Sequence, residues 1–228
     1  MKLDKKALLL VGSPKGEKST SASLGDYLIL KLKKFGMSSQ KLFIHRLVNR
    51  EEKLQELFHM IEKVDWIILT FPLYVDSLPA PVIKAMELIQ ENRTYRENKN
   101  SPNLITIANS GFPEASQNYT ALKICKIFSQ DCEFTWKGGV AVGGGGAING
   151  APLLEKGGMV RNVIKGLDII AEALNDDKEI PQEAVDLLAK KFIPTSLYRK
   201  FGNLGWRAQA KKYGVKQKIR DTPYSLKD

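Results

Sequence analysis

The protein has 228 residues, of which 43% are hydrophobic and 26% charged, so the composition supports a packed core and excludes global disorder. Its two cysteines, Cys125 and Cys132, have neither CxxC spacing nor a third partner, which argues against a disulfide scaffold and against any metal or iron–sulfur site. The net charge of +10 arises wholly in residues 190–220, which hold ten Lys and Arg and no acidic residue.

The first apolar run, in "MKLDKKALLLVG", is too short for a signal peptide or a membrane span, so we expect a cytoplasmic protein. That run is the first of several short apolar segments that end in Gly or Pro, a pattern typical of strands buried on both faces of a parallel sheet. In chain order, strands are expected at 6–13, 40–47, 66–72, 103–111 and 136–146.

Segments with the apolar periodicity of amphipathic helices separate the expected strands. Helices are expected around Leu24 to Leu32 and at 51–63, 80–91, 117–130, 158–175 and 181–191. Regular alternation of strand and helix predicts an α/β fold, a doubly wound five-stranded parallel sheet with helices on both faces. Composition changes near residue 192, so we expect a domain at 1–191 and a basic, aromatic-rich, helical C-terminal extension at 192–228.

In such a sheet, ligands bind outside the carboxyl ends of the strands. The first loop there, "GSPKGEKSTS" at 12–21, opens a helix whose backbone N–H groups favour an anion. Hydroxyl groups and a lysine suggest a phosphate, although the same serines would also suit a helix cap. The candidate ligands of that phosphate are Ser13, Lys15, Ser19, Thr20 and Ser21, with Lys18 as an alternative cation.

The fragment "GEKST" only approaches a nucleoside triphosphate loop. That motif needs a second glycine five residues after the first, and five residues after Gly12 stands Glu17, which also separates Gly16 from Lys18. The GxGxxG dinucleotide fingerprint is absent from this loop as well. The glycines at 143–146, after the last strand, are open to two interpretations, a flexible connection or close backbone packing.

The second loop, "PLYVDSLPA" at 72–80, is apolar and stiffened by proline at a strand end where loops are normally polar. Such a wall suits a flat aromatic ligand, and together with the phosphate loop it predicts FMN. The candidate contacts with its ring are Pro72, Leu73, Tyr74, Val75 and Asp76, with no residue expected to be catalytic.

Three strings, "LLVGSPKGEKSTSASLG", "WIILTFPLYVDSLPAPVIKAME" and "NSGFPEASQN", together resemble the flavodoxin-like NAD(P)H-dependent FMN reductase family over about residues 5–175. Lys15 stands where that family often has Arg, and Thr20 and Ser21 where it often has Asn-Thr. The resemblance implies a flavodoxin-like fold, FMN as cofactor, NAD(P)H as co-substrate and a homodimer. It also implies that the third string closes over the edge of the ring through Asn109, Ser110, Gly111 and Phe112.

The family implies an oxidoreductase that passes electrons through N5 of FMN to a flavin, quinone, azo or nitro acceptor. An alternative is an electron carrier of the flavodoxin type. Another is a flavoprotein docked through residues 192–220 to an anionic membrane surface or an acidic partner. An extra helix with solvated charges is the simplest interpretation of that segment, and nothing else in the chain favours nucleic acid.

Overall fold

The computed structural model describes residues 5–97, 99–192 and 194–222. The chain divides into two compact units, residues 1–192 and residues 193–228, which are described one at a time. Unit 193–228 contains helix α7 (Thr195–Lys212), which ends before Gly214 in a left-handed conformation, and then a short 3₁₀ turn, Lys216–Lys218.

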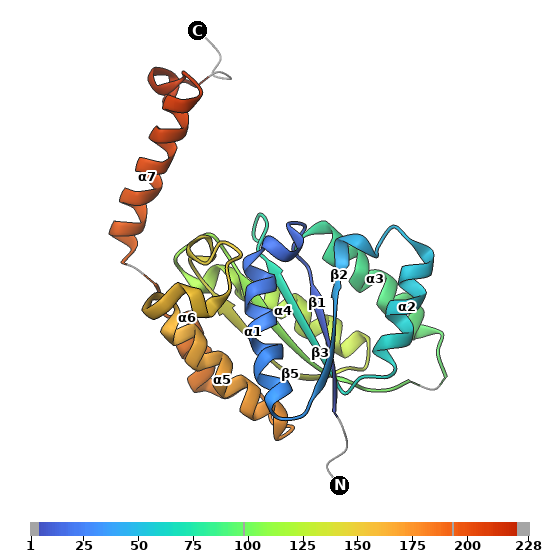
Figure 1. The fold of residues 1–228 in the computed structure, drawn as a ribbon. Coiled ribbons are helices and arrows are strands. Elements are labelled where there is room, and N and C mark those ends of the chain that lie inside the picture. The colour runs from blue at the N-terminus through green and yellow to red at the C-terminus, as the bar shows by residue number, and fades with distance from the viewer. Residues whose placement is uncertain (1–4, 98, 193, 223–228) are drawn as a thin grey trace. The chain divides into compact units, whose positions relative to one another are not determined.

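The expected α/β fold with a five-stranded parallel sheet is confirmed in unit 1–192 (Figure 1). All neighbouring strands are parallel, and their order across the sheet is β2-β1-β3-β4-β5. The chain therefore winds outward in one direction from β1 to β2, and in the other from β3 to β5. The strands are β1 (Lys6–Val11), β2 (Ser38–Phe43), β3 (Trp66–Pro72), β4 (Asn103–Asn109) and β5 (Thr135–Val142).

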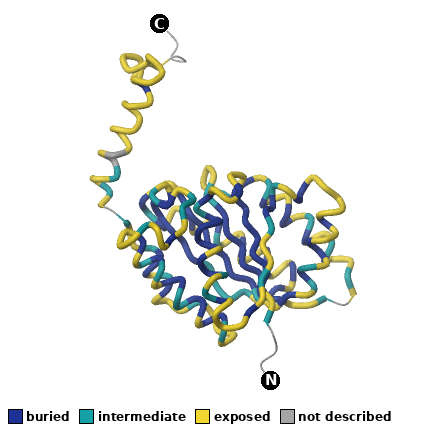
Figure 2. Tube along the Cα trace, viewed as in Figure 1, coloured by how far each residue is buried: buried dark blue, intermediate teal, exposed yellow. Residues whose placement is uncertain are grey.

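Helices cover both faces of this sheet and enclose two apolar cores (Figures 1 and 2). Alternate side chains of one strand enter opposite cores, because successive residues of a strand point to opposite faces: Leu9 joins one core, and Leu8 and Leu10 join the other. The first core packs against α1 (Thr20–Lys34), α5 (Arg161–Asn175) and α6 (Gln182–Ala189); the second packs against α2 (Glu51–Ile61), α3 (Ala80–Thr94) and α4 (Tyr119–Asp131).

Four strands end earlier than the sequence predicts: β1 and β4 end two residues early, and β2 and β5 end four residues early. β2 stops at Phe43, which pairs with Val11, the last residue of β1. Residues Ile44–Arg46 then form a 3₁₀ turn, and Gly12, which follows β1, donates its amide to the carbonyl of Thr70 in β3. In the same way β5 ends at Val142, the partner of the last residue of β4, so the glycines that follow belong to a loop.

Candidate functional site

A cavity opens at the carboxyl edge of the sheet, where the order of the strands reverses between β1 and β3. The loops after β1, β3, β4 and β5 all contribute to its wall, as expected for the ligand site of a doubly wound sheet. Its lining residues are Ser13, Lys15, Lys18, Ser19, Thr20, Ser21, Pro72, Leu73, Tyr74, Asn109, Ser110, Gly111, Gly145, Gly146 and Asn149.

The hydroxyl groups of the first loop divide into two kinds by their hydrogen bonds. Ser19 is the N-cap of α1: its Oγ accepts from the Ala22 amide at 3.1 Å and donates to the Gly16 carbonyl at 2.6 Å. Thr20 Oγ1 donates to the Gly145 carbonyl at 2.8 Å. Both hydroxyl hydrogens are therefore used within the protein, and the capping role considered for Ser19 is present in the structure.

In their hydrogen bonds to the described residues, Ser13 and Ser21 act only as acceptors. Ser13 Oγ accepts from the Lys15 amide at 3.4 Å, and Ser21 Oγ accepts from Asn109 Nδ2 at 2.8 Å. Each hydroxyl therefore keeps its hydrogen for a ligand in the cavity. The amides of Thr20 and Ser21, in the first turn of α1, have no acceptor among the residues that the structure describes.

The charges around this loop are separated by sign. Lys15 and Lys18 line the cavity, and neither forms an ion pair with another described residue. The carboxylate of Glu17 instead pairs with Lys41 at 2.8 Å, and Lys41 also bonds Asp26 at 3.0 Å. Burial lowers the pKa of Lys41, but its hydrogen bonds to these two carboxylates outweigh that effect and raise it. Glu17, the residue that separates Gly16 from Lys18 in the sequence, therefore does not line the cavity.

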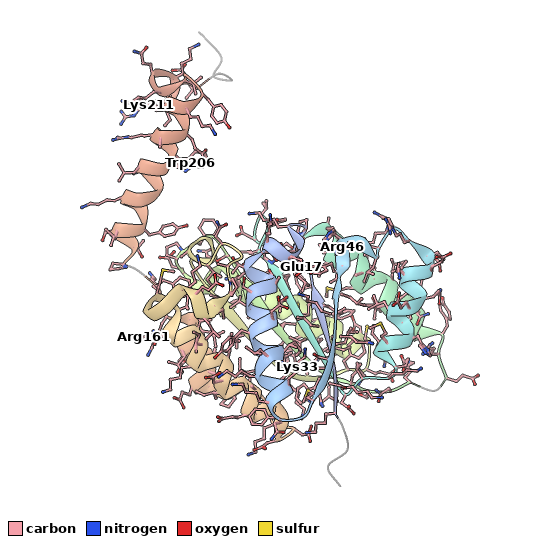
Figure 3. All side chains as sticks on the ribbon, viewed as in Figure 1. Glu17, Lys33, Arg46, Arg161, Trp206 and Lys211 are labelled. Atoms are coloured by element: carbon pink, nitrogen blue, oxygen red, sulfur yellow. The ribbon has the colours of Figure 1, made fainter. Side chains whose placement is uncertain are left out.

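The turn after β2 flanks the first loop from outside the cavity. A Cβ on Gly16 would lie 3.5 Å from Arg46 Nη2 and 3.7 Å from His45 Cε1. Figure 3 labels Arg46 near the same end of the sheet as Glu17, and its guanidinium lies 4.6 Å from the centroid of the Phe43 ring. These side chains support the loop without lining the cavity.

The loop after β3 forms the apolar wall and then turns away from it. Leu73 continues the strand pairing by donating its amide to the Asn109 carbonyl at 2.7 Å. Tyr74 and Ser77 exchange two backbone hydrogen bonds, which close a tight turn. Val75 and Asp76 form the tip of this turn, with φ of 48° and 62°. Because they are at the tip, they do not line the cavity, and Val75 is 98% exposed.

Asn109, at the end of β4, joins three of the loops. Its buried Nδ2 donates to Ser21 Oγ at 2.8 Å and to the Phe71 carbonyl at 2.9 Å, and its own carbonyl accepts from the loop after β3. Ser110 and Gly111 follow it along the wall. The side chain of Phe112 is 55% exposed and lies off the cavity, because its carbonyl is held by the Gly144 amide at 2.6 Å.

The loop after β5 closes the phosphate loop from the other side, a role that the sequence analysis did not assign. A Cβ at Gly150 would lie 2.5 Å from the carbonyl of Lys18, and one at Gly143 would lie 2.4 Å from the carbonyl of Pro113. Both positions therefore require glycine, so close backbone packing is the correct interpretation of this segment. Its glycines were the available signal, but nothing in them identified Asn149 as a lining residue.

The structure thus brings the predicted site residues of all three loops together around the cavity, except Val75, Asp76 and Phe112. The part of the chain that the structure describes contains no group of His, Cys, Asp and Glu that could hold a metal ion. Burial raises the pKa of both Cys125 and Cys132 to about 12, so neither thiol is a nucleophile at neutral pH. The cavity can bind and orient a ligand, and the described residues that line it include no carboxylate, imidazole or thiol.

Comparison with known proteins supplies structural relatives only. Neither a protein-family model nor a curated protein sequence matches the chain. An FMN-dependent NADH-azoreductase from Bacillus anthracis str. Ames Ancestor, solved in complex with FMN, is similar with a TM-score of 0.56 at 14% identity, covering 75% of this chain and 100% of its own. An NAD(P)H:quinone oxidoreductase from Methanothermobacter marburgensis has a TM-score of 0.54 at 11% identity, covering 75% of this chain and 96% of its own.

A flavodoxin from Streptococcus pneumoniae TIGR4 is similar to the same extent, with a TM-score of 0.53 at 14% identity, covering 75% of this chain and 99% of its own. At sequence identities this low, structural similarity supports a shared fold but not a shared reaction. The structural neighbours nevertheless include the flavin reductases that the three strings resemble, and together they show that this chain has the flavodoxin-like fold.

Proposed function

We propose that the protein is an FMN-dependent NAD(P)H oxidoreductase, with the terminal phosphate of FMN in the first loop and the ring against the loop after β3. The observation that carries this proposal is the composition of the cavity: cations and unused donors at one end and an apolar wall at the other. A phosphorylated aromatic cofactor needs both ends, the cations for its phosphate and the apolar wall for its ring.

The donors present fit a phosphate group. The Ser13 and Ser21 hydroxyls and the first amides of α1 offer hydrogen bonds, while Lys15 and Lys18 supply positive charge. At the other end, a Cβ on Gly111 or Gly146 would meet nothing within 4 Å, so a flat ligand has free space beside the wall.

Bound FMN would supply the hydride and electron transfer between NAD(P)H and a small-molecule acceptor such as a quinone, azo or nitro compound. The protein's own residues would position it: the first loop holds the phosphate, and Pro72, Leu73 and Tyr74 exclude water from one side of the ring. Asn109 keeps these two loops in register through its bonds to Ser21 and Phe71. A homodimer, as the family resemblance implies, is part of the proposal.

A binding titration tests the cofactor. Purified protein should quench FMN fluorescence on binding, and anaerobic addition of NADH or NADPH should bleach the flavin absorbance. Lys15→Gln with Lys18→Gln should weaken FMN binding about 100-fold or more, since each of the two charge-assisted contacts contributes about 1.5–3 kcal/mol. Riboflavin, which lacks the phosphate, should bind this variant and the wild type alike.

Lys123→Gln with Lys126→Gln, two exposed lysines of α4 outside the cavity, is the matched charge control. Absence of FMN binding, or equal losses for FMN and riboflavin, would show that the first loop does not hold the phosphate.

An electron carrier of the flavodoxin type is the second candidate, favoured by the similarity to the pneumococcal flavodoxin. It predicts the same FMN affinity but no bleaching by either nicotinamide nucleotide. The unit that holds the cavity carries no excess charge outside its end near residue 190, whereas a strongly acidic surface is usual for such carriers. Single-turnover reduction by NADH and NADPH decides between the two candidates.

A further inference from the structure

The positive charge of this protein is concentrated beyond the flavodoxin-like unit. Residues 190–220 contain ten Lys and Arg and no Asp or Glu, while the rest of the chain has 25 of each sign. Five of these cations lie within α7, and three more follow at Lys216, Lys218 and Arg220. The cavity described above uses none of them, so this charge needs another explanation than FMN.

Helix α7 combines this charge with an apolar row. Leu197, Leu204 and Ala208 stand at i, i+7 and i+11, so they share one face of the helix. Figure 2 colours almost the whole helix as exposed, and Leu197 and Leu204 are 39% and 60% exposed. Burial of these two leucines against an apolar surface would be favourable, because it would remove apolar area from water.

A row of cations runs beside the apolar row with the same spacing. Each cation of this row stands three positions after a member of the apolar row: Lys200 after Leu197, Arg207 after Leu204 and Lys211 after Ala208. Residues three positions apart are neighbours on the surface of a helix, so the two rows lie side by side. All three side chains are exposed. Trp206, 67% exposed and labelled in Figure 3, stands nine positions after Leu197 and therefore on the opposite face of the helix.

We propose that α7 binds an anionic membrane surface, lying in the plane of the interface with its apolar row toward the acyl chains and its cations on the lipid headgroups. Such a surface satisfies both rows at once. A second copy of α7 would bring two sets of like charges together, and the apolar row ends at Ala208 because Lys211 occupies its next position. A nucleic acid would satisfy the cations but leave Leu197 and Leu204 without a role.

The helix would lie on the membrane and not cross it. Across the described ranges of the chain, no helix combines the length and the apolar character that a membrane span requires. Anchoring would depend on the sum of the charges, because each cation near an anionic surface strengthens binding about fivefold at physiological ionic strength.

The test uses the full-length protein and sedimentation with sucrose-loaded vesicles, either of phosphatidylcholine alone or with phosphatidylglycerol added. We expect binding only to the anionic vesicles, weakening as salt increases. Lys211→Gln with Lys212→Gln should lower the partition coefficient roughly 30-fold. Lys123→Gln with Lys126→Gln, the same charge change on α4, should change it less than about twofold.

Tryptophan fluorescence gives a second readout that does not depend on sedimentation. The chain has three tryptophans; Trp66 is fully buried and Trp136 is half-buried, which leaves Trp206 as the exposed one. Because Trp206 faces away from the apolar row, the probe is Leu204→Trp in a Trp206→Phe background. Its emission should shift to the blue with anionic vesicles, and brominated lipid should quench it. Trp206→Phe alone should show neither signal while sedimentation persists.

Three results would overturn the proposal: no binding to anionic vesicles at low salt, equal losses for the α7 and α4 variants, or binding of an oligonucleotide but not of vesicles. Far-ultraviolet circular dichroism, measured on every variant, serves as the folding control, because it reports the helix content of both units.

Discussion

Asn109 offers the most direct test of how the loops around the cavity are held together. Its side chain is 5% exposed and donates to Ser21 Oγ at 2.8 Å and to the Phe71 carbonyl at 2.9 Å. Asn109→Leu has a similar shape and removes both hydrogen bonds. At about 1 kcal/mol each, the loss should lower the free energy of unfolding by about 2 kcal/mol. For a chain of this length that corresponds to a fall in Tm of about 6 °C.

The measurement is urea unfolding followed by circular dichroism, with a thermal melt beside it. Asn103→Leu is the matched control, since Asn103 begins the same strand and its side-chain amide forms no hydrogen bond in the described part of the chain. We expect the control to change stability by less than about 0.5 kcal/mol. Equal effects of the two variants, or a loss below that value for Asn109→Leu, would refute the role of this amide as the link between the loops.

Three further predictions concern the backbone and the thiols. Val75→Asn should raise stability by about 1 kcal/mol in a thermal melt, because a β-branched residue at φ 48° is strained and its 98% exposed side chain has no packing to lose; no gain would contradict the turn. Gly150→Ala should lower the Tm, since its Cβ would lie 2.5 Å from the first loop's backbone at φ +74°, whereas Gly146→Ala, with open space, should not. Cys125 and Cys132 should resist a thiol reagent at pH 8 until the protein unfolds, and rapid labelling of the native protein would contradict their burial. Burial raises both pKa values from 9.0 to about 12. The free energy of unfolding should therefore be unaffected by these thiols below pH 9 and should fall as the pH rises from 9 to 12.

Much of the fold could be predicted because its signals are local. Each strand of the sheet centre is a continuous apolar run, and both faces of the sheet are covered, so runs such as "WIILTFP" correspond closely to the observed β3. The ends of β2 and β5 could not be predicted this way. Each strand stops where its neighbour stops, at Val11 and Asn109, and the sequence of one strand does not contain its register with another.

In the candidate site, too, some features could be predicted from the sequence and others depend on contacts between distant segments. Loop position predicted which segments meet, because parallel strands share one carboxyl edge. The orientation of single side chains within those loops depends on tertiary contacts. Val75 lies outside the cavity because Tyr74 and Ser77 pair across the turn, and Phe112 does because Gly144 holds its carbonyl. Asn149 lines it because Gly150 packs on the first loop, a contact between segments far apart in the sequence.

The charges around the first loop decide what kind of phosphate it suits. Lys15 and Lys18 line the cavity, and its wall contains no acidic side chain among the described residues. Glu17 stands between these lysines in the sequence, but Lys41 holds its carboxylate outside. The cavity therefore offers two positive charges and no carboxylate for magnesium. A phosphate monoester carries about −1.5 to −2 at pH 7, which two lysines balance, whereas a triphosphate would leave about half of its charge unmatched. This balance favours the single phosphate of FMN for "GSPKGEKSTS", despite its similarity to a triphosphate loop.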